Sequence, residues 1–270
     1  MRISLSLLLF LFSFESGACQ FKKHVSKVYS FSGVTSVALR EMGLLTNPVV
    51  KGISVFNPIQ KSEFSGRRFP AGIYLSHDTF KELGGGVLFY DESREINSVL
   101  APISSIQSIE IKTRGLNPLE VGHLVEKELA LFVQGCEKEF SALRMKMENS
   151  AATLLQQTPQ DRSVVYYLGG LNNGRPPEMI IVQDGVVKWL LQQKKIKTYP
   201  SPLAYVNWSA KIMHSMPKNT LHILVKDSGS EGMKNLVKEK NYWVLTYPGS
   251  LVPGLTQLEA WNYFEVAASP

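Results

Sequence analysis

The chain has 270 residues, of which 44 % are hydrophobic and 19 % charged, and its formal net charge is +6. This composition is typical of a globular protein with one large core or two smaller ones. Lysine and arginine occur in short clusters, without a basic stripe interleaved with aromatic residues, so we do not expect nucleic-acid binding.

The first eighteen residues have the pattern of an export signal. Arg2 supplies a positive start, residues 3–14 form an apolar run too short to span a bilayer, and small residues occupy positions 16–18. We therefore predict a periplasmic protein. Ordinary signal peptidase cleavage would leave a soluble chain, whereas Gly17-Ala18-Cys19 also resembles the end of a lipobox, with a lipid thioether on Cys19. Both alternatives are open at this point.

The second cysteine, Cys136, lies on the apolar stripe of a predicted helix, and we expect it to be buried and reduced. A disulfide with Cys19 is not expected, because the start of the mature chain would have to reach that helix. No zinc spacing of cysteine and histidine is present, and the histidines lack carboxylates at ligand spacing. We predict neither a metal site nor a cofactor.

The first half of the chain alternates strands with helices. Gly43 ends the first predicted helix, and the run from Gly84 to Gly86 ends the second, which begins at an N-cap at Ser76. This order predicts parallel strands with right-handed crossovers. The predicted strands are residues 25–31, 49–56, 87–90 and 106–112, and the predicted helices are residues 34–42, 75–83 and 92–100.

The middle of the chain predicts one long helix. It begins with Asn117-Pro118-Leu119-Glu120, where Asn117 and Glu120 can form a capping box and Pro118 needs no N–H partner. Uninterrupted to Thr158-Pro159, it would be on the order of 50 Å long. Its apolar stripe is Val121, Val125, Leu129, Phe132, Cys136, Phe140, Leu143 and Met147.

The second half repeats the alternation without a visible sequence repeat. Strands are predicted at residues 162–168, 221–226 and 242–245, and helices at residues 179–192, 208–216, 231–239 and 256–266. The predicted fold is α/β, with two three-layer lobes built on parallel sheets and a ligand cleft between them. Its predicted parts are a signal peptide (1–18), an N-terminal lobe (19–114), a linking helix (115–157) and a C-terminal lobe (158–270).

Several segments resemble the helical-backbone periplasmic solute-binding proteins (class III, cluster A), which serve ABC importers of cobalamin, haem and ferric siderophores. The resemblance covers nearly the whole mature chain. It is carried by Lys27–Gly33, Val50–Ser54, Ser76–Tyr90, Gly115–Pro118, Tyr199-Pro200, Tyr247-Pro248 and Pro253–Leu255. The resemblance implies a bulky ligand held between the lobes and delivered to an inner-membrane permease by a monomeric carrier.

Loop residues at the strand ends are the candidate ligand contacts, with aromatic rings for stacking and Arg175 for a carboxylate. Each also has an ordinary structural interpretation: Tyr90 and Tyr205 as core residues, Asn172 as part of a turn, Arg175 as a solvated loop charge and Trp208 as helix packing. In haem-binding members a tyrosine near the position of Tyr74 coordinates iron. The candidates are Ser32, Thr35, Asn57, Tyr74, Tyr90, Asn172, Arg175, Tyr205, Trp208, Tyr247 and Ser250.

In the family, one acidic residue on each lobe pairs with permease arginines, and Asp78 occupies the first of these positions. The second falls near Ala210 and Lys211, neither of which is acidic. Val252 and Thr256 stand where many members carry arginines, which favours a less acidic ligand.

An enzyme is not expected, since the sequence has no nucleophile elbow, P-loop or dinucleotide-binding glycine pattern. The alternative to a transport receptor is a diverged periplasmic interaction module with the same fold.

Overall fold

The computed structural model describes residues 18–55, 58–69, 78, 81, 83–92, 105–157, 164–169, 179–182, 185–195, 205–207, 221–227, 235–239, 242–247, 252 and 254–262. For the strands between residues 164 and 247 it describes the course of the backbone. The predicted helices at residues 92–100 and 208–216 lie outside the described residues.

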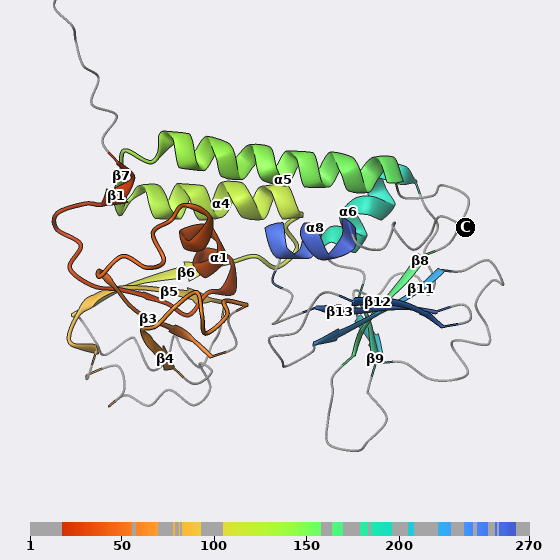
Figure 1. The fold of residues 1–270 in the computed structure, drawn as a ribbon, viewed down its shortest axis with the longest axis horizontal. Coiled ribbons are helices and arrows are strands. Elements are labelled where there is room, and N and C mark those ends of the chain that lie inside the picture. The colour runs from red at the N-terminus through yellow and green to blue at the C-terminus, as the bar shows by residue number, and fades with distance from the viewer. Residues whose placement is uncertain are drawn as a thin grey trace, which may run out of the picture.

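The first sheet has five parallel strands in the order β4-β3-β2-β5-β6 (Figure 1). The predicted strands of the first half are confirmed, and the short strand β4 is an addition at one edge. The parallel course follows from the crossover segments that separate the strands. The strands are β2 (Val28–Ser30), β3 (Val50–Ser54), β4 (Arg67–Phe69), β5 (Gly86–Asp91) and β6 (Ile106–Ile111).

Both faces of this sheet are covered, as the alternation along β5 shows. Val87 and Phe89 join the main hydrophobic core, whereas Leu88 and Tyr90 join a second cluster on the opposite face. The main core is covered by helix α1 (Gly33–Glu41), the confirmed counterpart of the predicted helix at residues 34–42. The prediction of a layered α/β lobe holds for the first sheet.

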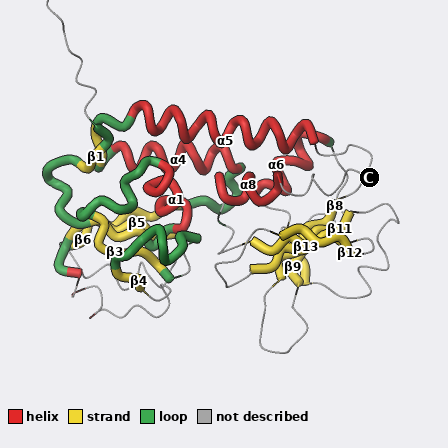
Figure 2. The backbone as a smooth tube through the Cα atoms, viewed as in Figure 1, coloured by secondary structure: helices red, strands yellow, loops and turns green. Residues whose placement is uncertain are grey.

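The predicted long helix is wrong, because the segment forms an antiparallel hairpin of two helices (Figures 1 and 2). Helix α4 (Pro118–Ala130) begins with the predicted capping box, and helix α5 (Glu137–Gln157) runs back beside it. The whole apolar stripe is buried as predicted. The chain turns at residues 131–136, where Gly135 has a φ of 66° and the Phe132 ring packs edge-on against Phe89, with ring centroids 5.4 Å apart.

The second sheet has six strands in the order β10-β9-β8-β11-β13-β12 and is mixed, which corrects the prediction of a parallel sheet. Among the described strands of this second sheet, only the pairs β8–β11 and β11–β13 are parallel. The strands are β8 (Val164–Gly169), β9 (Met179–Val182), β10 (Tyr205–Asn207), β11 (Leu221–Asp227), β12 (Asn235–Glu239) and β13 (Tyr242–Tyr247).

Two helix predictions in this half are wrong. The segment at residues 179–192 divides into strand β9 and helix α6 (Gly185–Lys194), and the segment at residues 231–239 contains strand β12. Both new strands pair antiparallel with a neighbour. Pairing with an adjacent strand overrides a weak helical spacing in such short segments. Helix α8 (Leu255–Asn262) confirms the last predicted helix and starts one residue earlier than predicted; the residues after 262 lie outside the described part of the chain.

The helices of both halves share one hydrophobic core. Buried residues of α1, α4, α5, α6 and α8 belong to the same cluster as the residues on one face of the first sheet. In Figure 1 these helices lie along one side of the molecule, with the two sheets below them. A shared helical layer therefore joins the sheets, rather than a single rod that holds two independent lobes apart.

Lys146 of α5 joins the two halves by ion pairs. Its Nζ lies 2.7 Å from Glu41 Oε2 at the end of α1 and 3.2 Å from Glu259 Oε1 in α8. Burial favours protonated Glu41, but hydrogen bonds from Lys146 and Arg40 outweigh it and lower the pKa of the Glu41 carboxyl below its usual value. The ionised pair therefore stabilises the position of α8 against α1 and α5.

Gly86 provides a test of the first sheet, because its φ is 117° and a β-carbon there would lie 2.7 Å from the Lys27 carbonyl oxygen. We expect Gly86→Ala to lower the free energy of unfolding by more than about 2 kcal/mol, the upper cost of a strained backbone alone. The matched control is Gly115→Ala, at φ 79° in open space, with an expected loss of about 1 kcal/mol. Urea denaturation measures both, and equal losses would contradict the collision at Lys27.

Lys146→Met should lower the free energy of unfolding by about 1 kcal/mol at pH 7, a magnitude typical of a partly exposed ion-pair network. Because the folded pKa of Glu41 is lowered, its contribution is present above the ordinary pKa of a glutamate and is lost as the pH falls through the folded value. The difference between variant and parent should therefore shrink in acid. Lys138→Met, an exposed lysine of the same helix, is the control. A pH-independent difference in thermal unfolding would count against the ion pairs.

Candidate functional site

The carboxyl ends of the parallel strands in the first sheet gather polar side chains around the start of α1. β2 leads into Ser32, β3 ends at Ser54, and β5 ends at Asp91. Ligands of open α/β sheets bind at this edge, because the strands end there and the helix N-termini face it. This edge is therefore the first part of the candidate site.

Ser32 is the N-cap of α1, and its Oγ accepts a hydrogen bond from the Thr35 backbone N–H at 3.3 Å. Ser36 closes the turn from behind, since its hydroxyl donates to Ser30 Oγ at 2.7 Å. All these residues are buried, so the helix start is held by a desolvated network of short polar side chains. The sequence places it there because small polar residues follow β2 directly.

Asp91 faces the same helix start from the neighbouring strand. Its Oδ2 accepts from the Gly33 backbone N–H at 3.3 Å, and its carboxyl also hydrogen-bonds to the Ser32 side chain. The residue is exposed at the sheet edge, and its carboxyl lies against the start of α1 through these two hydrogen bonds. That loss of hydration raises the pKa of the Asp91 carboxyl, and the bonds to Ser32 and Gly33 only partly oppose the rise.

Thr35 carries the unsatisfied polar atom of this edge. Its side chain is fully buried, and Oγ1 has no hydrogen-bond partner among the protein atoms. A buried hydroxyl without a partner costs free energy, so its presence needs an explanation. Thr35 lies in the first turn of α1, within the buried network, and its hydroxyl is a candidate donor or acceptor for a bound molecule.

The second sheet contributes an edge of the same kind, described by its backbone. β8, β11 and β13 are parallel, and their carboxyl ends are Gly169, Asp227 and Tyr247, with Asp227 paired to Tyr247. β10 runs antiparallel to β9, and Tyr205 pairs with Val182 at the end of β9 that is distant from Gly169. Tyr247 thus lies at the carboxyl edge, as predicted, and Tyr205 does not.

The segment that follows the carboxyl end of β13 reaches the start of α1 at Gly33. A β-carbon at Gly33 would collide with the Val252 side chain, five residues beyond Tyr247. Val252 is held by the start of α8, where the Thr256 hydroxyl donates to the Val252 carbonyl oxygen at 2.7 Å. Val252 and Thr256 are therefore buried, and they serve as packing and as a cap of α8.

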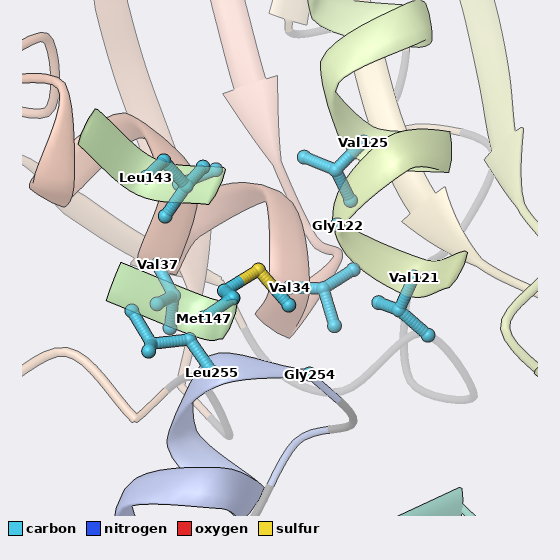
Figure 3. A pocket seen from close by; sticks show the side chains of 10 residues that line it. Val34, Val37, Val121, Gly122, Val125, Leu143, Met147, Gly254 and Leu255 are labelled. Carbon is cyan, nitrogen blue, oxygen red and sulfur yellow. The ribbon is translucent and has the colours of Figure 1, made fainter. Parts of the chain in front are cut away.

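A small apolar cavity lies behind this junction, among α1, α4, α5 and the start of α8 (Figure 3). Figure 3 shows the Met147 side chain at its centre, with Val34 and Val121 around it. The cavity has only apolar residues and glycine in its lining, so it offers nothing to orient a polar ligand. We interpret it as part of the packing between the helices.

Tyr90 is buried in this structure, and its contact with a ligand stays a prediction. It is 5 % exposed and belongs to the second hydrophobic cluster, so the ordinary interpretation as a core residue holds. Asp78 is exposed and helical, as a docking residue requires, and its role stays a prediction. The other candidates lie outside the residues whose side chains are described: Asn57, Tyr74, Asn172, Arg175, Tyr205, Trp208, Tyr247 and Ser250.

Asp91 was missed by the sequence analysis, although a signal was present. It directly follows the apolar strand at residues 87–90, and an acidic residue at the end of a buried parallel strand marks the ligand edge. Within the described part of the chain, no group of three or more metal-ligating side chains occurs, and no helix is both long and apolar enough to cross a bilayer.

Comparison with solved structures identifies the fold. The periplasmic heme-binding protein HutB of Vibrio cholerae superposes with a TM-score of 0.67 at 14 % sequence identity, over 92 % of this chain and 100 % of that chain. A periplasmic heme-binding protein from Pseudomonas aeruginosa has a TM-score of 0.63 at 12 % identity, over 91 % and 94 %. This chain has the fold of the periplasmic binding proteins.

An ABC transporter substrate-binding protein from Listeria monocytogenes has a TM-score of 0.59 at 9 % identity, over 89 % of this chain and 97 % of that chain. These likenesses confirm the predicted two-lobed α/β class, and the proteins compared are binding proteins rather than enzymes. No protein-family model matches the sequence, and no curated protein matches it.

Asp91→Asn should raise the melting temperature at pH 7. Since the folded pKa of Asp91 is raised, folding disfavours the ionised carboxylate above that pKa, and the penalty disappears as the pH falls below the unfolded value. The amide of the variant keeps an oxygen that can accept from the Gly33 N–H. The rise in melting temperature should therefore vanish near pH 3. Thermal unfolding across pH measures it, with Glu92→Gln, an exposed neighbour, as the control. A loss of stability at pH 7 would contradict this account.

Proposed function

We propose that this protein is the substrate-binding component of an ABC importer and carries a bulky ligand between its two sheets. The observation that carries the proposal is that each sheet has parallel strands with a carboxyl edge of the kind that binds ligands, and that the segment after β13 reaches the start of α1, where Val252 lies against Gly33. The full-length likeness to HutB, a periplasmic heme-binding protein, supports the same assignment.

The ligand class we propose is that of cobalamin, haem or an iron siderophore. The shared helical layer supports a large ligand, since helices packed in one core permit only small relative motion of the sheets. At the start of α1, the charged Asp91 lies beside the neutral Ser32 and Thr35. This favours a ligand that presents hydrogen-bond donors there, rather than a cluster of carboxylates.

We further propose that the mature chain divides as residues 19–114, 115–157 and 158–270, with delivery to an inner-membrane permease. Asp78 is the proposed contact of the first lobe, because it is exposed on a helical segment and carries the charge that permease arginines would pair. The carrier is proposed to be a monomer.

The proposal predicts that one of three probes raises the melting temperature of the purified protein: hemin, cyanocobalamin or ferrichrome. A ligand present at 100 times its dissociation constant stabilises by about 2.7 kcal/mol. Thr35→Val should leave the unliganded protein as stable or slightly more stable, because it removes an unpaired buried hydroxyl. It should also lower the affinity for the probe by roughly tenfold.

Ser36→Ala is the matched control, since its hydroxyl is bonded within the protein. It should lower stability by about 1 kcal/mol and leave the affinity of the probe unchanged. No shift with any probe would count against the proposed ligand class. Stable capture of a periplasmic protein instead would favour an interaction module.

A further inference from the structure

The start of the mature chain is built into the bend between α4 and α5. Cys19 is bonded to Cys136 by a disulfide, across a sequence separation of 117 residues. Beside it, strand β1 (Gln20–Phe21) pairs antiparallel with strand β7 (Val133–Gln134). The structure thereby corrects the expectation of a reduced Cys136 and of a chain start that cannot reach the helix.

The residues that follow make further contacts with the bend, and we call the whole set of contacts between residues 19–22 and residues 130–136 the seam. Phe21 is 7 % exposed and belongs to the main core. Lys22 donates from its backbone N–H to the Phe132 carbonyl oxygen at 2.8 Å and from Nζ to the carbonyl oxygens of Ala130 and Leu131 at 3.1 and 2.9 Å. A lysine on these carbonyls also complements the negative end of the α4 dipole. The seam is therefore part of the fold without the disulfide bond.

The bond lies at the start of the helix that joins the two sheets. The Cys136 carbonyl oxygen accepts from the Phe140 backbone N–H at 2.9 Å, which makes Cys136 part of the first turn of α5. The same helix carries Lys146, which pairs with α1 and α8. Fixing Cys136 therefore fixes one end of the element on which the arrangement of the two halves depends.

We propose that Cys19 is a half-cystine that pairs with Cys136 after export and is not a lipid acceptor. One sulfur cannot carry both a thioether and a disulfide, and the seam already brings the Cys19 sulfur to Cys136. The two thiols lose two protons and two electrons to a disulfide-bearing oxidoreductase of the periplasm, which leaves as a dithiol. The mature carrier is then soluble, and this inference does not rest on the proposed ligand.

The test is the intact mass of the full chain, expressed with its own leader in a Gram-negative host and separated into periplasmic and membrane fractions. We expect the protein in the periplasmic fraction. Denatured without reductant, it should take up no alkylating reagent, and after reduction it should take up two alkyl groups. Protein retained in the membrane with a mass raised by acyl chains, or two thiols alkylated without reduction, would overturn the proposal.

Stability gives a second measurement that does not depend on cell fractionation. Reduction, or the double substitution Cys19→Ala with Cys136→Ala, should lower the melting temperature by about 5–15 °C, as expected for a native disulfide in a chain of this length. Lys22→Met is the control that weakens the seam and leaves both cysteines in place, and its disulfide should still form. An unchanged melting temperature on reduction would show that the bond does not join the seam.

Discussion

The packing of α8 and its preceding segment onto α1, α4 and α5 is the constraint on which the rest of this structure depends. Val252 fills the space that the missing side chain of Gly33 leaves, and Gly254 lies against Val121 and Met147. Lys146 adds charge to the same contact by pairing with Glu41 and Glu259. This contact joins the segment after β13 to the start of α1, and it therefore links the second sheet to the carboxyl edge of the first.

A polar site and an apolar support thus occupy opposite sides of one junction. On one side are Ser32, Thr35 and Asp91, with an unpaired hydroxyl and a carboxyl whose pKa is raised by loss of hydration. On the other is a continuous core of helices, with a small apolar cavity around Met147 (Figure 3). Unfavourable groups persist where the surrounding structure holds them in place, and such groups concentrate at binding sites.

Local patterns were read correctly where the signal lay within one element. The capping box at Asn117, the start of β5 at the run of three glycines and the buried stripe of α4 and α5 all match, because each depends on neighbouring residues. The prediction of a single helix failed at Gly135. The stripe keeps its spacing through the bend, and the contacts made there, of Phe132 with Phe89 and of β7 with β1, come from distant segments of the chain. Strands β9 and β12 were missed because pairing with a neighbour decides short segments.

The sequence by itself determined the alternation of strands and helices, the parallel first sheet and the candidate residues Ser32 and Thr35, since apolar periodicity and short polar caps act over a few residues. Tertiary structure decided the rest: that Tyr90 is buried, that Asp91 reaches the start of α1, and that Cys19 bonds to Cys136. These features depend on which distant segments become neighbours. Packing in the shared core, rather than the preference of any one segment, stabilises that arrangement.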